Sequence, residues 1–411
     1  MSLLHALANG LTVALIPHEG PFTAVALGYK VGAAHEAETA AGVAHLLEHL
    51  LFEDDRIAYD ARLQAVGGST NAYTGQDYTV YYARFPSEAL PLALELEAER
   101  LFRLQLDPQK VEIQKQVVAE EFRQRYLNPP YADRFFHLAR AAFGAHPYGT
   151  MVIGQSPEQV LTLTLADLAH FYSAYYAPTH AVLCVAGPHL NAEVEALIQL
   201  YFGQERPAAV LPEVPSAEIL PPPTPYTAIE APVPQTAVIW AYSLPPLEHP
   251  DLPAIDLLDD YLGEGRAGFL VRRLVEETQL ASRIATYVWS FHQGGLWVIE
   301  GYLNSGVAPE TYEAALEAAL EALKEADLEE VLTLYRPKRY LQVHRQREKA
   351  LDKALALVHA VLAGHPEWYE EPLKPYQALG AADLARTART YLTAERRVRL
   401  HYLARKNGAT A

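Results

Sequence analysis

Two histidines and a glutamate stand among leucines in the segment Gly42-Val43-Ala44-His45-Leu46-Leu47-Glu48-His49-Leu50-Leu51-Phe52. The leucines indicate a largely buried helix, on which His45, Glu48 and His49 share one face because residues three and four apart are neighbours. Two imidazoles on adjacent turns can bind a single Zn²⁺, and the glutamate between them then reaches a water on that ion rather than the ion itself. The order His-x-x-Glu-His is the inverted form of a zinc-hydrolase motif. As ordinary helix residues, the same three groups would be costly to bury.

A third zinc ligand must come from elsewhere in the chain, because a catalytic zinc site has three protein ligands and one open position. The pattern of residues 110–126 predicts a helix that carries Glu112, Glu120 and Glu121. Each of these glutamates could equally lie on a solvated face, and spacing alone does not choose between them. Gln114 and Glu121 are two turns apart and therefore share a face of this helix.

Composition limits the class of protein. The chain has 411 residues, enough for two or three domains, with 50% hydrophobic and 20% charged residues, as in globular proteins. No apolar run reaches the roughly 18 residues that span a bilayer, and the N-terminus lacks a signal-peptide pattern. Cys184 is the only cysteine, which excludes a disulfide framework and fits a reducing compartment. We therefore expect a cytoplasmic protein without membrane insertion. The net charge of −17 disfavours nucleic-acid binding.

A proline-rich segment divides the chain into two similar halves. Residues 209–224 are predicted to form an extended, semi-rigid linker between domains at 1–208 and 225–411. The halves repeat one another in order, and the matching pairs are 23–29 with 236–242, 45–50 with 256–261, and 166–175 with 382–391. One duplicated domain explains this order better than coincidence does.

Within each half, β-rich runs alternate with longer helical patterns. Residues 78–85 and 181–186 are examples of the first kind, and 309–326 and 328–363 of the second. This alternation predicts an α+β fold with two homologous domains, each a mostly antiparallel sheet with helices packed on one face.

The sequence resembles the pitrilysin, insulinase and mitochondrial processing peptidase family. The resemblance extends over both halves and is most specific in the first, where it is carried by the segments Gly32-Ala33-Ala34-His35-Glu36, 42–52, Gly67-Gly68-Ser69-Thr70-Asn71-Ala72-Tyr73-Thr74, Asp77-Tyr78-Thr79-Val80-Tyr81-Tyr82 and Val117-Val118-Ala119-Glu120-Glu121-Phe122. It implies the pitrilysin-type fold and a bacterial two-domain zinc metallopeptidase subunit that acts on peptides or unfolded segments.

The resemblance also implies roles for the residues around the metal. Glu121 would be the third zinc ligand, with Glu120 as the fallback, and Glu48 would be the general base. Gln114 stands where the family usually has a glutamate that supports a zinc-binding histidine. An amide at this position can still orient the ring, but it removes a charge and could weaken metal binding.

Substrate and partner residues follow from the same resemblance. Asn71 and Ala72 match the strand to which an extended peptide adds through main-chain hydrogen bonds. Val275 and Ser282 occupy positions where the family has an arginine and a tyrosine that stabilise the developing oxyanion. The missing pair implies a heterodimer in which a homologous subunit supplies the arginine and tyrosine. A homodimer is the alternative, and it would have zinc sites without these donors.

Two other functions compete with the peptidase. A non-catalytic structural or assembly subunit of the same fold is favoured by Val275 and Ser282 and opposed by the intact set of His45, Glu48, His49 and Glu121. A zinc-binding or buffering protein would hold the metal without hydrolysing anything. The sequence also does not separate zinc from manganese or cobalt.

The second half has carboxylates at the place of the metal helix. Asp256, Asp259 and Asp260 could form a site for a hard cation. No further ligands are evident in the sequence, so we expect a decayed copy with a solvated acidic face.

Overall fold

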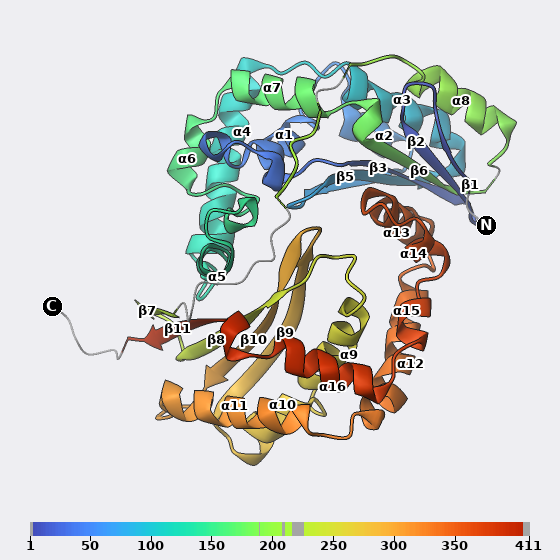
Figure 1. The fold of residues 1–411 in the computed structure, drawn as a ribbon. Helices are drawn as coiled ribbons and strands as arrows, with labels where there is room; N and C mark the ends of the chain where they lie inside the picture. The colour runs from blue at the N-terminus through green and yellow to red at the C-terminus, as the bar shows by residue number, and fades with distance from the viewer. Residues whose placement is uncertain (1–2, 189, 208–209, 216–225, 406–411) are drawn as a thin grey trace. The chain divides into compact units, whose positions relative to one another are not determined.

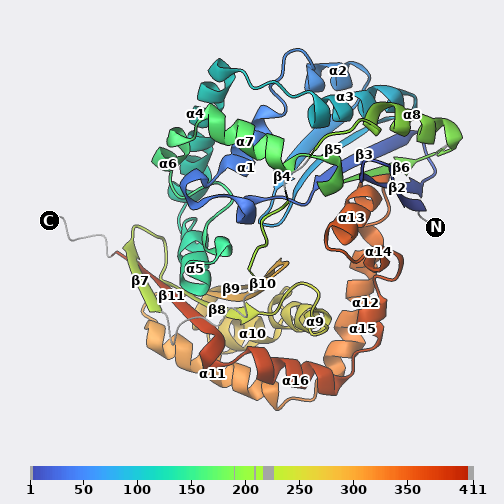
Figure 2. The same cartoon turned by 45° about the horizontal axis from the view of Figure 1, so that its top comes forward.

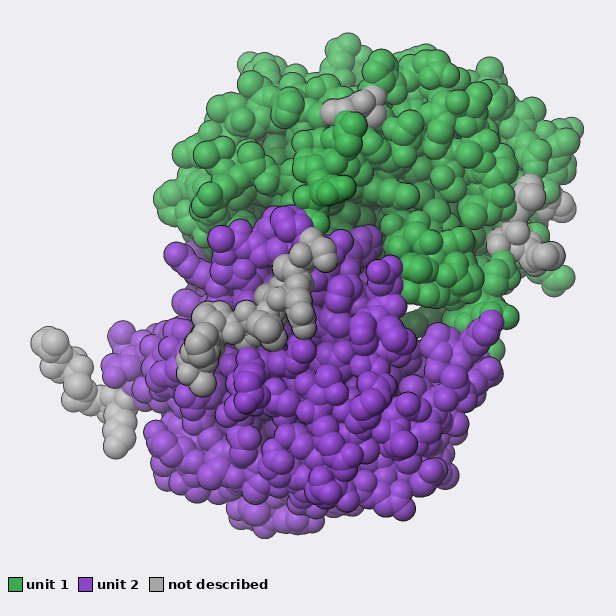
Figure 3. All heavy atoms as spheres, in the orientation of Figure 1, with its two compact units in different colours: residues 1–123, 150–214, 343–372 green, residues 124–149, 215–342, 373–411 purple. Residues whose placement is uncertain are grey.

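The computed structural model describes residues 3–188, 190–207, 210–215 and 226–405 (Figure 1). The chain divides into two compact units (Figure 3). Unit 1 comprises Met1–Arg123, Thr150–Val214 and Val343–Pro372, and unit 2 comprises Gln124–Gly149, Pro215–Gln342 and Leu373–Ala411. Of the predicted linker, residues 209 and 216–224 lie outside the described residues. The boundaries 1–208 and 225–411 stay a prediction about the sequence repeat, since each compact unit draws segments from both halves.

Unit 1 is built on a six-stranded sheet with the order β1-β2-β6-β3-β5-β4. Its strands are β1 (Leu3–Ala6), β2 (Thr12–Pro17), β3 (Phe22–Tyr29), β4 (Ser69–Thr74), β5 (Thr79–Pro86) and β6 (Ala181–Gly187). Only β2 and β6 run parallel, and every other neighbouring pair is antiparallel. Strand β4 is the last strand at one edge of this sheet.

Unit 2 repeats this topology. Its sheet has the order β7-β11-β8-β10-β9, from β7 (Tyr226–Ala231), β8 (Ala237–Leu244), β9 (Ala281–Phe291), β10 (Gly294–Leu303) and β11 (Arg397–Ala404). Strands β7 and β11 are parallel and the other pairs antiparallel. The sheet of unit 1 from β2 to β4 has the same order and directions, so the predicted α+β fold with two homologous domains is confirmed.

The helices of the first half are α1 (Val43–Leu50), α2 (Tyr59–Ala65), α3 (Leu90–Phe102), α4 (Pro108–Phe122), α5 (Arg134–Phe143), α6 (Pro157–Thr162), α7 (Leu165–Tyr175) and α8 (Ala192–Phe202). Those of the second half are α9 (Leu252–Gly263), α10 (Phe269–Val271), α11 (Pro309–Lys324), α12 (Glu329–Arg345), α13 (Ala350–Leu362), α14 (Glu367–Glu370), α15 (Lys374–Gln377) and α16 (Ala381–Tyr391). Within the described residues, no helix has both the length and the apolar character needed to cross a bilayer.

The two halves exchange one helix each. Helix α13 belongs to the second half but packs on the sheet of unit 1, opposite α1 and α3 (Figure 2). At Gly28 an added Cβ would lie 2.6 Å from Val358 Cγ1, so only a glycine allows this close approach. Helix α5 of the first half packs in the same way on β8 and β11 of unit 2. The sequence predicted helices on one face of each sheet and did not predict these exchanged helices on the other face.

Candidate metal centre

The predicted metal helix is α1, and a buried carboxylate caps its N-terminus. Gly42 precedes the helix with φ 89°, a left-handed conformation that suits glycine. The two oxygens of Glu36 accept hydrogen bonds of 2.8 Å from the backbone N–H groups of Gly42 and Ala44. Burial raises the pKa of Glu36 to about 8, and these two hydrogen bonds oppose the rise. The cap fixes the start of the helix at Val43, two residues before His45.

Leucines hold α1 in the core so that its polar face stays available. Leu46 and Leu47 are fully buried, whereas His45 and His49 are only partly buried, with side chains 13% and 23% exposed. The two imidazole rings lie with centroids 4.8 Å apart and at 77° to one another. The spacing of four residues therefore places both rings on one face, as the sequence predicted.

Glu121 joins the two histidines from the neighbouring helix α4. Its Oε2 lies 3.9 Å from His45 Nε2 and 3.4 Å from His49 Nε2. Among the described residues, His45, His49 and Glu121 form the one group of three whose ligand atoms all lie within 4.8 Å of one another. Glu120 instead pairs with Arg123 at 3.4 Å and is 53% exposed. The structure thus brings Glu121, rather than the fallback Glu120, to the histidines.

The donor set fits a zinc ion. Zinc prefers imidazole nitrogen and carboxylate oxygen at about 2.0–2.2 Å in a tetrahedron, in which neighbouring ligand atoms are about 3.3–3.5 Å apart. The distance from His49 Nε2 to Glu121 Oε2 matches this value. The distance from His45 Nε2 to the same oxygen is about half an ångström longer. Two neutral rings and one carboxylate leave the fourth position of a tetrahedron for a water or a substrate oxygen.

Gln114 supports His49 from the next turns of α4. Its Oε1 lies 3.2 Å from His49 Nδ1, so the ring donates its Nδ1 proton to the amide oxygen and directs the Nε2 lone pair toward the metal position. Burial lowers the pKa of His49, but the hydrogen bond and charge of Glu121 outweigh this effect and raise it overall. Gln114 therefore contacts His49, the kind of histidine that the family resemblance implies it supports.

Glu48 lies beside the three ligand groups and not among them. Its Oε2 accepts a hydrogen bond of 2.5 Å from Thr74 Oγ1 at the end of β4. Burial raises the pKa of Glu48, while the Thr74 hydrogen bond and the charge of His49 oppose the rise. The sequence did not predict a role for Thr74, although it closes the motif segment that contains Asn71 and Ala72.

Asn71 and Ala72 lie on the edge strand. They pair with Tyr82 and Tyr81 of β5 on one side, and β4 ends the sheet on the other side. The Asn71 side chain accepts a 2.9 Å hydrogen bond from the N–H of Ala72, and Asn71 is exposed. This edge is the place where the sequence predicted that a peptide adds.

In unit 2 the equivalent helix α9 holds a different arrangement. Asp260 pairs with Arg339 of α12 at 2.9 Å, and Asp256 accepts a 2.6 Å hydrogen bond from Tyr376. Asp259 accepts one of 2.8 Å from the indole of Trp297. Burial raises the pKa values of Asp259 and Asp260 to about 6. The prediction of a solvated acidic face is wrong, because these carboxylates are half-buried and bonded to protein donors.

The predicted gap in the oxyanion donors is also visible in unit 2. Val275 packs against the hydrophobic core, and Ser282 Oγ donates a hydrogen bond of 3.0 Å to Gln235 Oε1. The nearby Tyr287 hydroxyl donates to the buried carboxylate of Glu300. Positions 275 and 282 therefore hold a core residue and a hydroxyl bonded to Gln235, in place of the arginine and tyrosine of the family.

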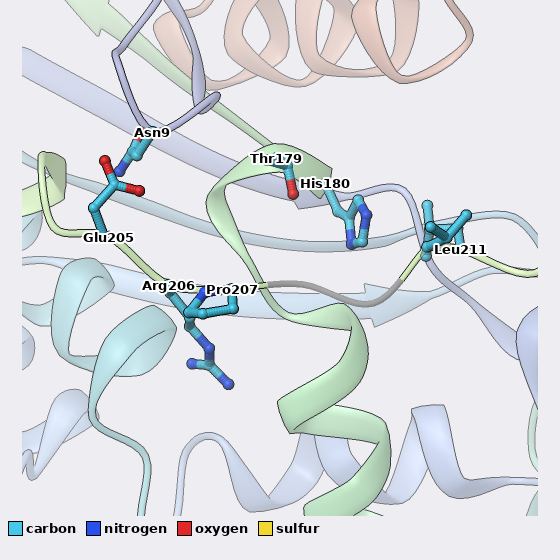
Figure 4. Close-up of a pocket in the computed structure, with 8 residues that line it drawn as sticks. Asn9, Thr179, His180, Glu205, Arg206, Pro207 and Leu211 are labelled. Atoms are coloured by element: carbon cyan, nitrogen blue, oxygen red, sulfur yellow. The ribbon is translucent and has the colours of Figure 1, made fainter.

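A separate hollow in unit 1 is lined by Asn9, Thr179, His180, Glu205, Arg206, Pro207, Val210 and Leu211 (Figure 4). Asn9 donates its side-chain protons to the carbonyls of Phe202 and Gln204, and Arg206 donates to the carbonyl of Tyr172. These side chains tie loops together, and none of them belongs to the predicted site.

The duplicated α+β fold and the His-x-x-Glu-His helix define the class of inverzincin-type proteins. The model of the insulinase family (peptidase family M16) matches residues 12–156, and that of the "peptidase M16 inactive domain" matches 162–334. The chain belongs to peptidase family M16.

Its relatives include proteins named as zinc proteases. "Zinc protease PqqE" of Helicobacter pylori is 30% identical over 342 residues, which cover 78% of this chain and 74% of the relative. "Probable mitochondrial-processing peptidase subunit beta" of Schizosaccharomyces pombe is 30% identical over 312 residues, 71% of this chain and 67% of the relative. The crystal structure of a protease from Helicobacter pylori superposes with a TM-score of 0.89 at 26% identity and covers 98% of this chain and 99% of that one.

Proposed function

We propose that the chain is a zinc metalloendopeptidase subunit that hydrolyses peptides or unfolded segments. The observation that carries the proposal is the convergence of His45, His49 and Glu121 within 4.8 Å, with the carboxylate of Glu48 on the same helix. A zinc ion held by such a set supplies Lewis acidity, which lowers the pKa of a coordinated water and polarises a carbonyl.

Glu48 handles the proton in this proposal. Its place three residues after His45 and one before His49 puts its carboxylate near His49 and Glu121, where it could reach a water on a bound ion. It accepts a proton from the attacking water and later returns it to the leaving amine. Thr74 holds one carboxylate oxygen, and burial favours the proton-bound form that this transfer produces.

The peptide binds as an added strand at the edge of β4. Outward-facing main-chain groups of the strand segment that contains Asn71 and Ala72 offer hydrogen bonds that depend little on the sequence of the peptide. The site therefore suits extended or unfolded chains rather than folded ones.

The partner is a homologous subunit that supplies the missing arginine and tyrosine. The support comes from Val275, which has no donor, from Ser282, whose neutral hydroxyl donates to Gln235, and from the word "subunit" in the name of one relative. The complex is a heterodimer in the cytoplasm, and a homodimer remains the alternative assembly.

A non-catalytic structural or assembly subunit is the second candidate. It is favoured by the match of residues 162–334 to a domain described as inactive and by Val275 and Ser282.

Two measurements on the pure chain and on Glu48→Gln separate the two candidates. One is the zinc content of each protein. The other is cleavage of an unfolded peptide, measured with and without a co-purified homologue. The peptidase requires one zinc per chain in both proteins and loss of cleavage in the variant alone. Bound zinc without cleavage under any of these conditions would establish the non-catalytic subunit or the zinc-buffering protein instead.

A further inference from the structure

Thr74 connects the edge strand to the carboxylate that handles the proton. Residues 73 and 74 of β4 point to opposite faces of the sheet, as neighbours on a strand do. Tyr73 contacts His359 of the exchanged helix α13, whereas the Thr74 hydroxyl donates to Glu48 Oε2 on α1. The last residue of the edge strand therefore holds the base of the proposed reaction.

We propose that Thr74 is a positioning residue that fixes the orientation of the Glu48 carboxylate. The proposal rests on the proposed function of Glu48. An ionised carboxylate only accepts hydrogen bonds, so the hydroxyl hydrogen of Thr74 has one direction in which to point. With Oε2 held by this donor, rotation of the carboxylate is restricted and Oε1 is left to accept the proton.

Thr74 lies on the same edge strand, β4, to which the peptide is proposed to add. The backbone of Thr74 pairs with Thr79 on β5, and Asn71 and Ala72 precede it on the same strand. A peptide that adds to the free edge of β4 is therefore aligned by the same six-residue strand that orients Glu48. This couples the register of the bound peptide to the position of the base.

The substitution Thr74→Val tests the role of the hydroxyl while keeping the packing of the side chain. Thr74→Val keeps the β-branched shape and the backbone pairing with Thr79 and removes only the donor, whereas Thr74→Ser keeps the donor. Thr70 is a matched control on the same face of β4, since its hydroxyl donates a 2.9 Å hydrogen bond to the carbonyl of Tyr82 rather than to Glu48.

The kinetic test uses the full chain loaded with zinc, together with its partner if activity requires one. Thr74→Val is expected to lower kcat about 10- to 100-fold with KM within about two-fold, because a misplaced catalytic group costs about this much. Thr74→Ser should restore kcat to within about three-fold, and Thr70→Val should lower kcat less than Thr74→Val does. A kcat of Thr74→Val within about two-fold of the parent, an equal loss in Thr70→Val, or no rescue by serine would overturn the proposal.

Two measurements do not depend on activity. Zinc content should stay at one ion per chain in every variant, and a loss in Thr74→Val would place the effect on the metal site instead of Glu48. Crystal structures should show the Glu48 carboxylate turned away in Thr74→Val and retained in Thr74→Ser. An unmoved carboxylate in the valine variant refutes the positioning role. If the parent protein hydrolyses nothing, the proposed function fails, and these structures still decide the role of Thr74.

Discussion

Replacing Glu121 by glutamine removes the one negative charge among the three ligand groups and leaves the shape of the side chain nearly unchanged. The carboxylate oxygen now lies 3.4 Å and 3.9 Å from the two histidine nitrogens. Glu120→Gln is the matched control on the adjacent residue of α4, because Glu120 is 53% exposed and pairs with Arg123. The two variants make the same chemical change on adjacent residues, of which only Glu121 lies near the two histidines.

The expected loss follows from the number of ligands. Apparent free energies of zinc binding of about 10–16 kcal/mol for four ligands correspond to about 2.5–4 kcal/mol for each, or roughly 100- to 1000-fold in Kd. At a free zinc concentration of about 1000 times the parental Kd, the metal stabilises the parent by about 4.1 kcal/mol. In Glu121→Gln the same zinc concentration stabilises by only about 0.4–1.4 kcal/mol.

Two assays measure this difference. Competition with a chelator gives Kd, and denaturant unfolding with and without zinc gives the stabilisation of the native state. Glu120→Gln should behave like the parent in both assays. The reasoning fails if Glu121→Gln keeps the parental affinity, and the ligand assignment reverses if Glu120→Gln loses the metal instead.

Three further outcomes are expected. Gln114→Leu should weaken zinc binding about 10- to 100-fold by chelator competition, and Gln114→Glu should not weaken it. Arg339→Met should destabilise the protein by about 2–3 kcal/mol in urea unfolding, because it leaves the half-buried Asp260 carboxylate unpaired. Lys338→Met, which breaks an exposed pair, should cost less than about 1 kcal/mol, and equal losses would contradict this account. Burial lowers the pKa of His359 from 6.5 to about 4, so the unfolded state binds more protons and stability falls as the pH drops from 6.5 towards 4. His359→Gln should flatten this slope by up to about 3 kcal/mol, and an unchanged slope would assign it to other groups.

The sequence predicted those parts of the site that depend on short-range spacing. His45, Glu48 and His49 lie on one helix, so a period of 3.6 residues is enough to place them on one face. The choice of Glu121 over Glu120 needed the family resemblance, since neighbouring residues on a helix face directions about 100° apart and only the packing of α4 on α1 decides between them. Thr74 was missed because its contact with Glu48 joins a strand end to a helix, and no local pattern encodes such a contact.

The second half showed a different limit of sequence reasoning. Three aspartates on a helix suggested a solvated face, because charged residues are seldom buried without partners. Their partners are Arg339, Tyr376 and Trp297, which lie far along the chain. A guanidinium on α12 contacts α9 much as the carboxylate of Glu121 on α4 contacts α1. The duplicated framework has therefore kept the contact between the two helices and reversed the sign of its charges.

Because α13 comes from the second half and packs into the core of unit 1, the stability of unit 1 depends on the second half. Hydrophobic periodicity shows that residues 350–362 form a helix with an apolar face, but it does not say which sheet that face covers. Leu357, Val358, Val361 and Leu362 pack into the core of unit 1, and burial of four such side chains contributes about 6–12 kcal/mol. This contribution is comparable to the whole stability of a typical domain, about 5–15 kcal/mol. All three residues of the candidate metal centre come from the first half, yet the sheet that supports them depends on a helix of the second. This packing ties the first half to its copy whether or not a metal is bound.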